Sequence, residues 1–219
     1  GVHVPFARTH VLSWAAAQLL RQNIRFEAGR FEYNLLTLSA TIEDVRLSST
    51  ESARPFFEAT TVRVNLPWSI LRGGVTVESL DIDHPVVTFV READGFINWP
   101  DFGSDDSTGG FNGPAHIGRL RVSDLTMRFD DAITDQHIEA RGLTLVMQRA
   151  GDAPLAGALS MAGPATLQAG THQSTLTTLA GGVSFDGFTV SLSDLAVATP
   201  EAQLAVRGTI DLLAATPLL

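Results

Sequence analysis

The sequence predicts a mainly β protein in which an N-terminal amphipathic helix precedes a long, curled, mostly antiparallel sheet. Three observations lead to this fold class. Apolar residues recur with a period close to two from Ile24 onwards, which is typical of strands with one apolar and one polar face. The alternation slips in the same way at five places. One segment, near the N-terminus, has the spacing of a helix.

The expected helix covers residues 5–23, PFARTHVLSWAAAQLLRQN, within an N-terminal unit of residues 1–23. Pro5 suits a first helical position, because the N–H that proline lacks has no partner there. An apolar stripe follows at helical spacing and consists of Leu12, Ala15, Ala16, Leu19 and Leu20. The polar side has too few cations for a helix that lies on a membrane surface, so we expect this helix to pack over one end of the sheet.

Residues 24–99 are expected to form the first module of the sheet. Val62, Val64 and Leu66 alternate with polar residues, a pattern typical of antiparallel sheets with one face in water. Asp94-Gly95 has the residue chemistry of a tight hairpin turn. This module is therefore predicted to consist of successive antiparallel strands.

The recurring slip has the form h-x-h-x-x-h-x-h, where h is an apolar residue. The skipped pairs are Glu43-Asp44, Glu78-Ser79, Ser123-Asp124, Arg141-Gly142 and Ser193-Asp194. A step of three positions turns the next apolar side chain to the opposite face unless a local device corrects it. A two-residue hairpin turn is one such device, but the skipped pairs lack its favoured Asn-Gly or Asp-Gly chemistry. We favour a β-bulge, which absorbs one residue and bends the strand, because repeated bulges would curl the sheet around its apolar side.

Residues 100–114, PDFGSDDSTGGFNGP, consist mainly of turn-forming and acidic residues and are interpreted as a flexible loop. Residues 115–219 return to the strand pattern, and we expect them to continue the same sheet. The chain lacks an initiator methionine and stops within an apolar run, GTIDLLAATPLL. We therefore interpret it as a fragment of a longer chain.

The composition and the polar residues argue against several classes of function. The formal net charge of −9 disfavours nucleic-acid binding, which needs clustered cations, and the absence of cysteine removes thiolate chemistry. The histidines are scattered, with none at metal-ligand spacing. The two adjacent aspartate pairs, Asp105-Asp106 and Asp130-Asp131, lie where loops and turns use aspartate for local hydrogen bonds. We expect a protein that is not an enzyme and that needs no metal or cofactor.

The apolar strand residues are the candidates for function, because they should share one face. They are Leu38, Ile42, Val45, Leu47, Val62, Val64, Val75, Val77, Leu80, Ile82, Val87, Phe89, Leu120, Val122, Leu125, Met127 and Phe129. Two interpretations remain open from these residues alone. In a closed β-sandwich the side chains meet a second sheet and form an ordinary core. In an open β-groove they form a binding surface, since an exposed apolar strip with an area larger than roughly a few hundred Å² indicates an interaction site.

Residues 59–99 also combine short features in a particular order. An alternating strand is followed by Ser69-Ile70-Leu71-Arg72-Gly73-Gly74, a strand from Val75 to Ile82, Pro85, the run VVTFVR, and Asp94-Gly95 with Asn98-Trp99. RFEYNLLTLSATIEDVRLSS comes before them, and IGRLRVSDLTMRFDD comes after. In this order and spacing, about residues 24–148 resemble the opening of the AsmA-like superfamily, which includes the TamB-like proteins.

The resemblance implies a taco-like groove, apolar inside, in the periplasm of a Gram-negative bacterium. It implies a tether to the inner membrane through an anchor upstream of this fragment. The implied function is to carry phospholipid acyl chains between the inner and outer membranes, with an outer-membrane β-barrel as a further partner. With this resemblance the groove is favoured over the closed sandwich. A second hypothesis is a scaffold that templates outer-membrane β-proteins by adding strands to an exposed edge.

Overall fold

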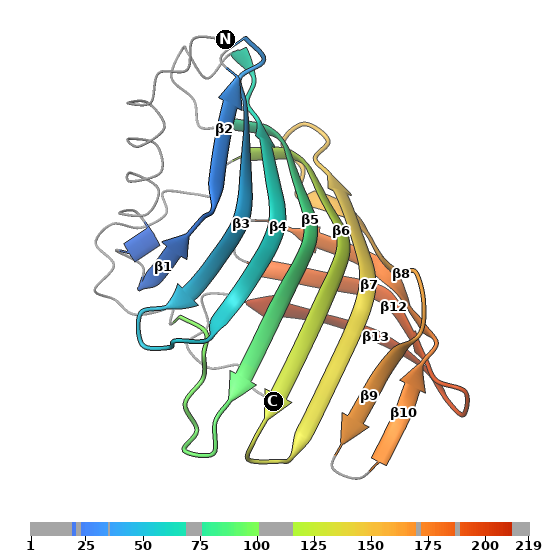
Figure 1. Cartoon of the computed structure of the whole chain (residues 1–219). Helices are drawn as coiled ribbons and strands as arrows, with labels where there is room; N and C mark the ends of the chain where they lie inside the picture. The colour runs from blue at the N-terminus through green and yellow to red at the C-terminus, as the bar shows by residue number, and fades with distance from the viewer. Residues whose placement is uncertain are drawn as a thin grey trace.

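The described residues form one large β-sheet of 13 strands (Figure 1). The computed structural model describes residues 19–20, 23–34, 36–68, 76–100, 116–169, 172–186 and 189–211. The strands are β1 (Ile24–Glu27), β2 (Arg30–Asn34), β3 (Ser39–Ser49), β4 (Pro55–Asn65), β5 (Thr76–Arg91), β6 (His116–Asp131), β7 (Gln136–Gln148), β8 (Leu155–Met161), β9 (Ala165–Ala169), β10 (His172–Leu176), β11 (Thr178–Phe185), β12 (Thr189–Ala198) and β13 (Gln203–Asp211). The prediction of a mainly β protein is confirmed.

Two predicted elements lie largely outside the described residues. The N-terminal helix is represented only by residues 19–20 and 23, and the loop at residues 100–114 only by Pro100. Within the described residues, no helix combines the length and the hydropathy that crossing a membrane requires.

Across the sheet the strands follow the order β1-β3-β4-β5-β6-β7-β8-β11-β12-β13, and β2 pairs with β3 beyond β1 along the same edge. Neighbouring strands are antiparallel, as expected, except that β5 and β6 run parallel. A parallel pair needs a crossover of about a dozen residues or more, and residues 92–115 supply it. Strands from both sides of this connection belong to the same sheet.

The sheet divides at β7. Residues 136–139 of β7 pair with β9, whereas residues 143–148 pair with β8. β8 leads on to β11, β12 and β13, and β9 pairs with β10. Figure 1 shows these two branches leaving β7 in different directions. Among the described residues, β1 and β13 do not pair with each other, so the sheet is not closed.

The core at this division shows the direction in which the sheet curls. Leu143 of β7 is completely buried, with Ala140, Ala165 and Leu176 buried beside it. The half-buried residues that pack against this cluster come from β6, β8, β11 and β12: Leu125, Leu159, Met161, Leu179 and Val197. β7, β8 and β11 lie between β6 and β12 in the sheet order. Side chains from β6 and β12 can therefore contact the same cluster only if the sheet curls towards the face that carries the cluster. We call the face that carries these residues the inner face.

Residues with an unusual backbone mark where the strands bend. Asp44, Asp124, Gly142 and Asp194 have φ values between 49° and 67°, and each is the second residue of a skipped pair. The pairing register shifts at the last three of these residues. The predicted bulges at residues 123–124, 141–142 and 193–194 are therefore confirmed. Aspartate and glycine suit these positions, because both tolerate the left-handed region better than most residues do.

The other two predicted bulges are wrong. At Asp44 the backbone is unusual, but β3 and β4 keep a constant register on both sides of it. Between Val77 and Leu80, β5 is regular, and its own irregular residue is His84, with a φ of 50°. The slip in β5 therefore lies between Ile82 and Pro85. Proline reads as a strand breaker in a sequence, which concealed this second slip.

Candidate functional site: the apolar inner face

The inner face of β3–β7 carries apolar side chains in continuous rows. Residues opposite one another in neighbouring strands point to the same side of a sheet, so the pairing register defines each row. Three such rows are Ala40, Val64, Leu80, Leu120 and Met147; Ile42, Val62, Ile82, Val122 and Leu145; and Leu47, Phe57, Val87, Met127 and Ala140. The rows run across the strands, so they join five strands into one apolar surface.

Most of the predicted residues come together on this face. They are Ile42, Val45, Leu47, Val62, Val64, Leu80, Ile82, Val87, Phe89, Leu120, Val122, Leu125, Met127 and Phe129. Val77 is a correction: it lies three positions before Leu80 in a regular strand, so it points to the outer face beside its partner Ile117. Leu38 lies in the turn before β3, and Val75 is outside the described residues.

The inner face also contains residues that the sequence prediction missed. Phe57 and Ala59 of β4, Pro85 of β5 and Leu143 of β7 all lie on it. β4 carries the same slipped pattern as its neighbours, with Phe57, Ala59, Val62 and Val64 as its apolar positions. This pattern in the sequence indicates that Phe57 and Ala59 belong to the apolar face. Thr60 and Thr61 at its centre make the pattern hard to recognise.

Burial on the inner face is highest beside the irregular residues that mark the bend, which are Asp44 in β3, His84 in β5, Asp124 in β6 and Gly142 in β7. Val45, Ala59 and Leu143 are between 0% and 5% exposed, and Pro85 is fully buried with them. On either side of the bend most inner-face residues, such as Ile82, are only half-buried, and Met127 is 45% exposed. A second sheet packed against these strands would bury such side chains almost completely. Apolar surface therefore remains accessible on both sides of the bend.

Aromatic rings occupy the end of the inner face where β5 and β6 finish. Phe89 and Phe129 stack with their ring centroids 5.3 Å apart and their planes 10° from parallel. Trp99 lies 6.5 Å from Phe89 and 5.0 Å from Phe56, measured between centroids. Aromatic pairs at such separations add stability beyond their buried area. This end of the face thus carries a cluster of aromatic rings, of which the Phe89–Phe129 pair is stacked and the two pairs with Trp99 are tilted.

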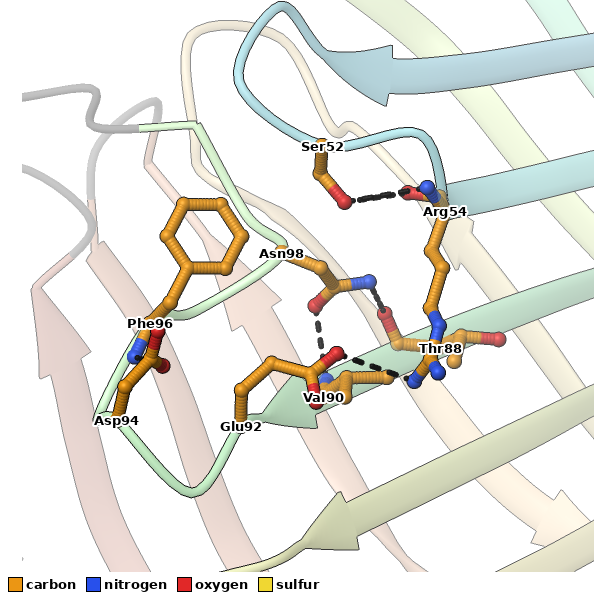
Figure 2. Close-up of polar contacts among 8 residues, drawn as sticks. All are labelled: Ser52, Arg54, Thr88, Val90, Glu92, Asp94, Phe96 and Asn98. Atoms are coloured by element: carbon orange, nitrogen blue, oxygen red, sulfur yellow. Dashed lines mark hydrogen bonds and ion pairs between the residues drawn. The ribbon is translucent and has the colours of Figure 1, made fainter.

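Asn98 positions the segment that carries Trp99 (Figure 2). The pairing of β4 with β5 stops at Phe57 and Val87, and Asn98 takes the place of the missing strand. Its Nδ2 donates to the Thr88 carbonyl (3.0 Å), and its Oδ1 accepts from the Val90 N–H (2.8 Å). Asn98 is only 2% exposed. The Asn98-Trp99 pair of the sequence motif therefore has a structural role.

The outer face of the same strands is polar, with paired charges. Arg46 of β3 lies 3.1 Å from Glu58 of β4, and Arg63 lies 2.6 Å from Asp83, in each case between the closest nitrogen and oxygen. These side chains are partly exposed to water, where such pairs contribute little stability. The sheet thus has a water-facing outer side and an apolar inner side.

The carboxylate pair at Asp130-Asp131 has a structural explanation. Asp131 is 4% exposed and pairs with Arg91, while the Thr134 hydroxyl (2.7 Å) and the Ile133 N–H (2.9 Å) donate to it. The Arg91 guanidinium is the main reason that the pKa of the Asp131 carboxyl lies well below its ordinary value. Asp130 contacts His137. Asp105-Asp106 lies outside the described residues, within which no cluster of three or more potential metal ligands occurs.

Comparison with known proteins does not assign the chain to a family. No protein-family model matches the sequence, and none of the curated proteins matches it. The resemblance to the AsmA-like superfamily therefore stays a prediction from the residues. The half-buried apolar rows are the feature that a functional assignment has to explain.

Proposed function

We propose that the protein is a non-enzymatic segment of a lipid-conducting β-groove, of the kind found in AsmA/TamB-like proteins. The observation that carries this proposal is the set of apolar rows that remain half-buried on the inner face of β3–β6. Phospholipid acyl chains would lie along this face. Their burial would contribute about 0.8 kcal/mol for each methylene removed from water.

The chemistry of the rows suits movement better than tight binding at one place. The row of Ile42, Val62, Ile82, Val122 and Leu145 offers branched aliphatic side chains of similar size. An acyl chain that slides along them exchanges one set of dispersion contacts for a similar set. Polar headgroups would stay at the open side of the curl, in water. The expected setting is the periplasm, between an inner membrane that holds the upstream anchor and an outer membrane that receives the lipid.

The proposal is tested by the lipid that accompanies the protein when it is purified from bacterial cells. We expect native mass spectrometry to show bound phospholipid. Leu80→Asp places a charge on the inner face and should remove most of that lipid. Val77→Asp is the matched control, since Val77 is half-buried in the same strand but faces outwards. Wild-type protein without lipid, or equal loss from both variants, would contradict the proposal.

Templating of β-strands is the second candidate function. It is favoured by β13, which ends the strand order and has an unpaired outer edge among the described strands. The Leu80→Asp variant also separates the two candidates. Loss of lipid with retained binding of unfolded outer-membrane protein supports conduction. Binding of unfolded outer-membrane protein that Leu80→Asp leaves unchanged, in a wild-type protein that carries no lipid, supports templating at β13 instead.

A further inference from the structure

β2 finishes and β3 begins at the upper end of the sheet in Figure 1. This end carries exposed apolar side chains. Leu36, in the turn between these strands, is 82% exposed, and Trp68, just after β4, is 60% exposed. The two segments are neighbours, because the Leu66 N–H donates to the Leu38 carbonyl (2.9 Å). Turns on a soluble surface usually carry polar residues, so a leucine and a tryptophan at adjacent tips indicate an apolar partner.

The turn that presents Leu36 is held in its shape by its own hydrogen bonds. The Asn34 side-chain oxygen accepts from the N–H groups of Leu36 (2.9 Å) and Thr37 (3.4 Å). Leu38 follows with a φ of 49°, which is uncommon for leucine. The outward position of Leu36 is therefore part of a defined turn.

Cationic side chains lie beside these apolar tips. Thr37 of the same turn borders a polar hollow of about 510 Å³ that is also lined by Arg119, Arg149 and Glu78. Arg149 is oriented by two bonds, from Nε to the Ile117 carbonyl (3.2 Å) and from Nη1 to the Ala153 carbonyl (2.9 Å). Guanidinium groups next to apolar tips match the phosphate layer of a bilayer, in which phosphates lie directly above the acyl chains.

At the opposite end of the sheet, Ile133 in the turn between β6 and β7 is 55% exposed, but the described turns there carry the carboxylates of Glu51, Glu92, Asp94 and Asp135 and one guanidinium, Arg54, which pairs with Glu92. Beside Leu36 and Trp68, the carboxylates of Glu78 and Asp152 are balanced by Arg119 and Arg149, so the opposite end carries the greater net negative charge. An anionic lipid surface would repel this end. The charges therefore favour one orientation of the sheet on such a surface.

We propose that the end defined by Leu36, Trp68, Arg119 and Arg149 docks directly on a phospholipid bilayer. Leu36 enters the acyl region, Trp68 lies at the level of the headgroups, where tryptophan is enriched in membrane proteins, and the two arginines face the phosphates. This contact goes beyond the proposed groove, because it needs the turn tips and no lipid on the inner face.

A site-specific probe tests this orientation, and the absence of cysteine from the chain makes labelling unambiguous. Leu36→Cys and Ile133→Cys variants of the 219-residue chain are labelled with an environment-sensitive fluorophore and mixed with vesicles of phosphatidylethanolamine and phosphatidylglycerol. We expect the Leu36→Cys probe to shift to the blue and to be quenched by lipids brominated on their acyl chains. The Ile133→Cys probe should stay in water. A Leu36→Cys probe that stays in water, or an Ile133→Cys probe that enters the bilayer, overturns the proposal.

Vesicle flotation supplies an independent measurement. The Leu36→Ser/Trp68→Ser protein should bind the same vesicles at least about tenfold more weakly than wild type, whereas Ile133→Ser should bind unchanged. The double variant should still carry co-purifying phospholipid, because its inner face is intact. Unchanged flotation of the double variant would overturn docking. Wild-type protein that inserts Leu36 but carries no lipid would overturn the groove and leave docking standing.

Discussion

Replacing Gly142 with alanine tests the physical basis of the bends. Gly142 has a φ of 67° in the bulge of β7, and an added Cβ would lie 3.7 Å from Ala162 Cβ and 3.8 Å from Asp124 Oδ1. These are ordinary contact distances, so the cost of the substitution comes from the backbone alone. Holding an L-residue in the left-handed region costs about 1–2 kcal/mol. Alanine regains roughly 0.4–1 kcal/mol by restricting the unfolded chain, which leaves a net destabilisation of about 1 kcal/mol.

Gly163→Ala is the matched control for this experiment. Gly163 lies in the connection between β8 and β9, its φ is outside the left-handed region, and an added Cβ meets nothing within 4 Å. Both variants gain the same stability because alanine restricts the unfolded chain. The difference between their free energies of unfolding therefore gives the cost of the left-handed backbone at Gly142. Thermal unfolding should place the Tm of Gly142→Ala about 2–8 °C below that of Gly163→Ala. Equal values of Tm would refute the argument that the bulge requires a left-handed residue.

Three further predictions concern other parts of the sheet. Asn98→Ala leaves the buried Val90 N–H unpaired and should lower the free energy of unfolding by about 1–3 kcal/mol in a urea titration. Gly181→Ala would place a Cβ 2.5 Å from Leu195 Cα and should destabilise the protein more than Gly142→Ala does, because β11 and β12 would have to separate. Because folding lowers the pKa of Asp131, stability should be lost as the pH falls below its ordinary pKa of 3.8, and Asp131→Asn should remove this part of the pH dependence.

Each of these predictions has an outcome that contradicts it. Wild-type stability of Asn98→Ala would mean that the segment after β5 is held by other contacts. A Gly181→Ala protein as stable as Gly163→Ala would mean that the two strands have room for a methyl group. An acid-unfolding profile that is the same in Asp131→Asn and wild type would assign the pH dependence to other carboxylates.

The fold class and most of the inner face could be predicted from the sequence because both depend on local alternation. Apolar positions with a period of two define one face of a strand, whatever lies beside it. The skipped pairs at Ser123-Asp124 and Ser193-Asp194 located bulges for the same reason. A bulge involves only neighbouring residues, so the spacing of the apolar residues on either side of it shows where the strand changes face.

The assignment of Val77 failed because spacing alone does not say where in a strand the slip lies. Val77 and Leu80 are three residues apart, and so are Ile82 and Pro85. Only the second step coincides with an irregular backbone, at His84. Proline lacks an N–H and is rare in central strands, so the alternation of apolar residues does not indicate Pro85 as a strand position.

Features that depend on distant parts of the chain could not be predicted. The parallel pairing of β5 with β6 depends on the path of residues 92–115, and the division at β7 depends on where β8 and β9 find their partners. The role of Asn98 depends on β4 stopping short of the end of β5. None of these leaves a periodic signal in the sequence.

Photo-crosslinking along β5 in living cells tests the central claim most directly. A photoreactive residue is placed in turn at Ser79, Leu80, Asp81, Ile82, Val86 and Val87, and covalent phospholipid adducts are measured. The inner face predicts adducts at Leu80, Ile82 and Val87 and few at the other three, so that the alternation changes phase across His84. Adducts of equal strength at all six positions, or none at the inner-face positions, would contradict the account.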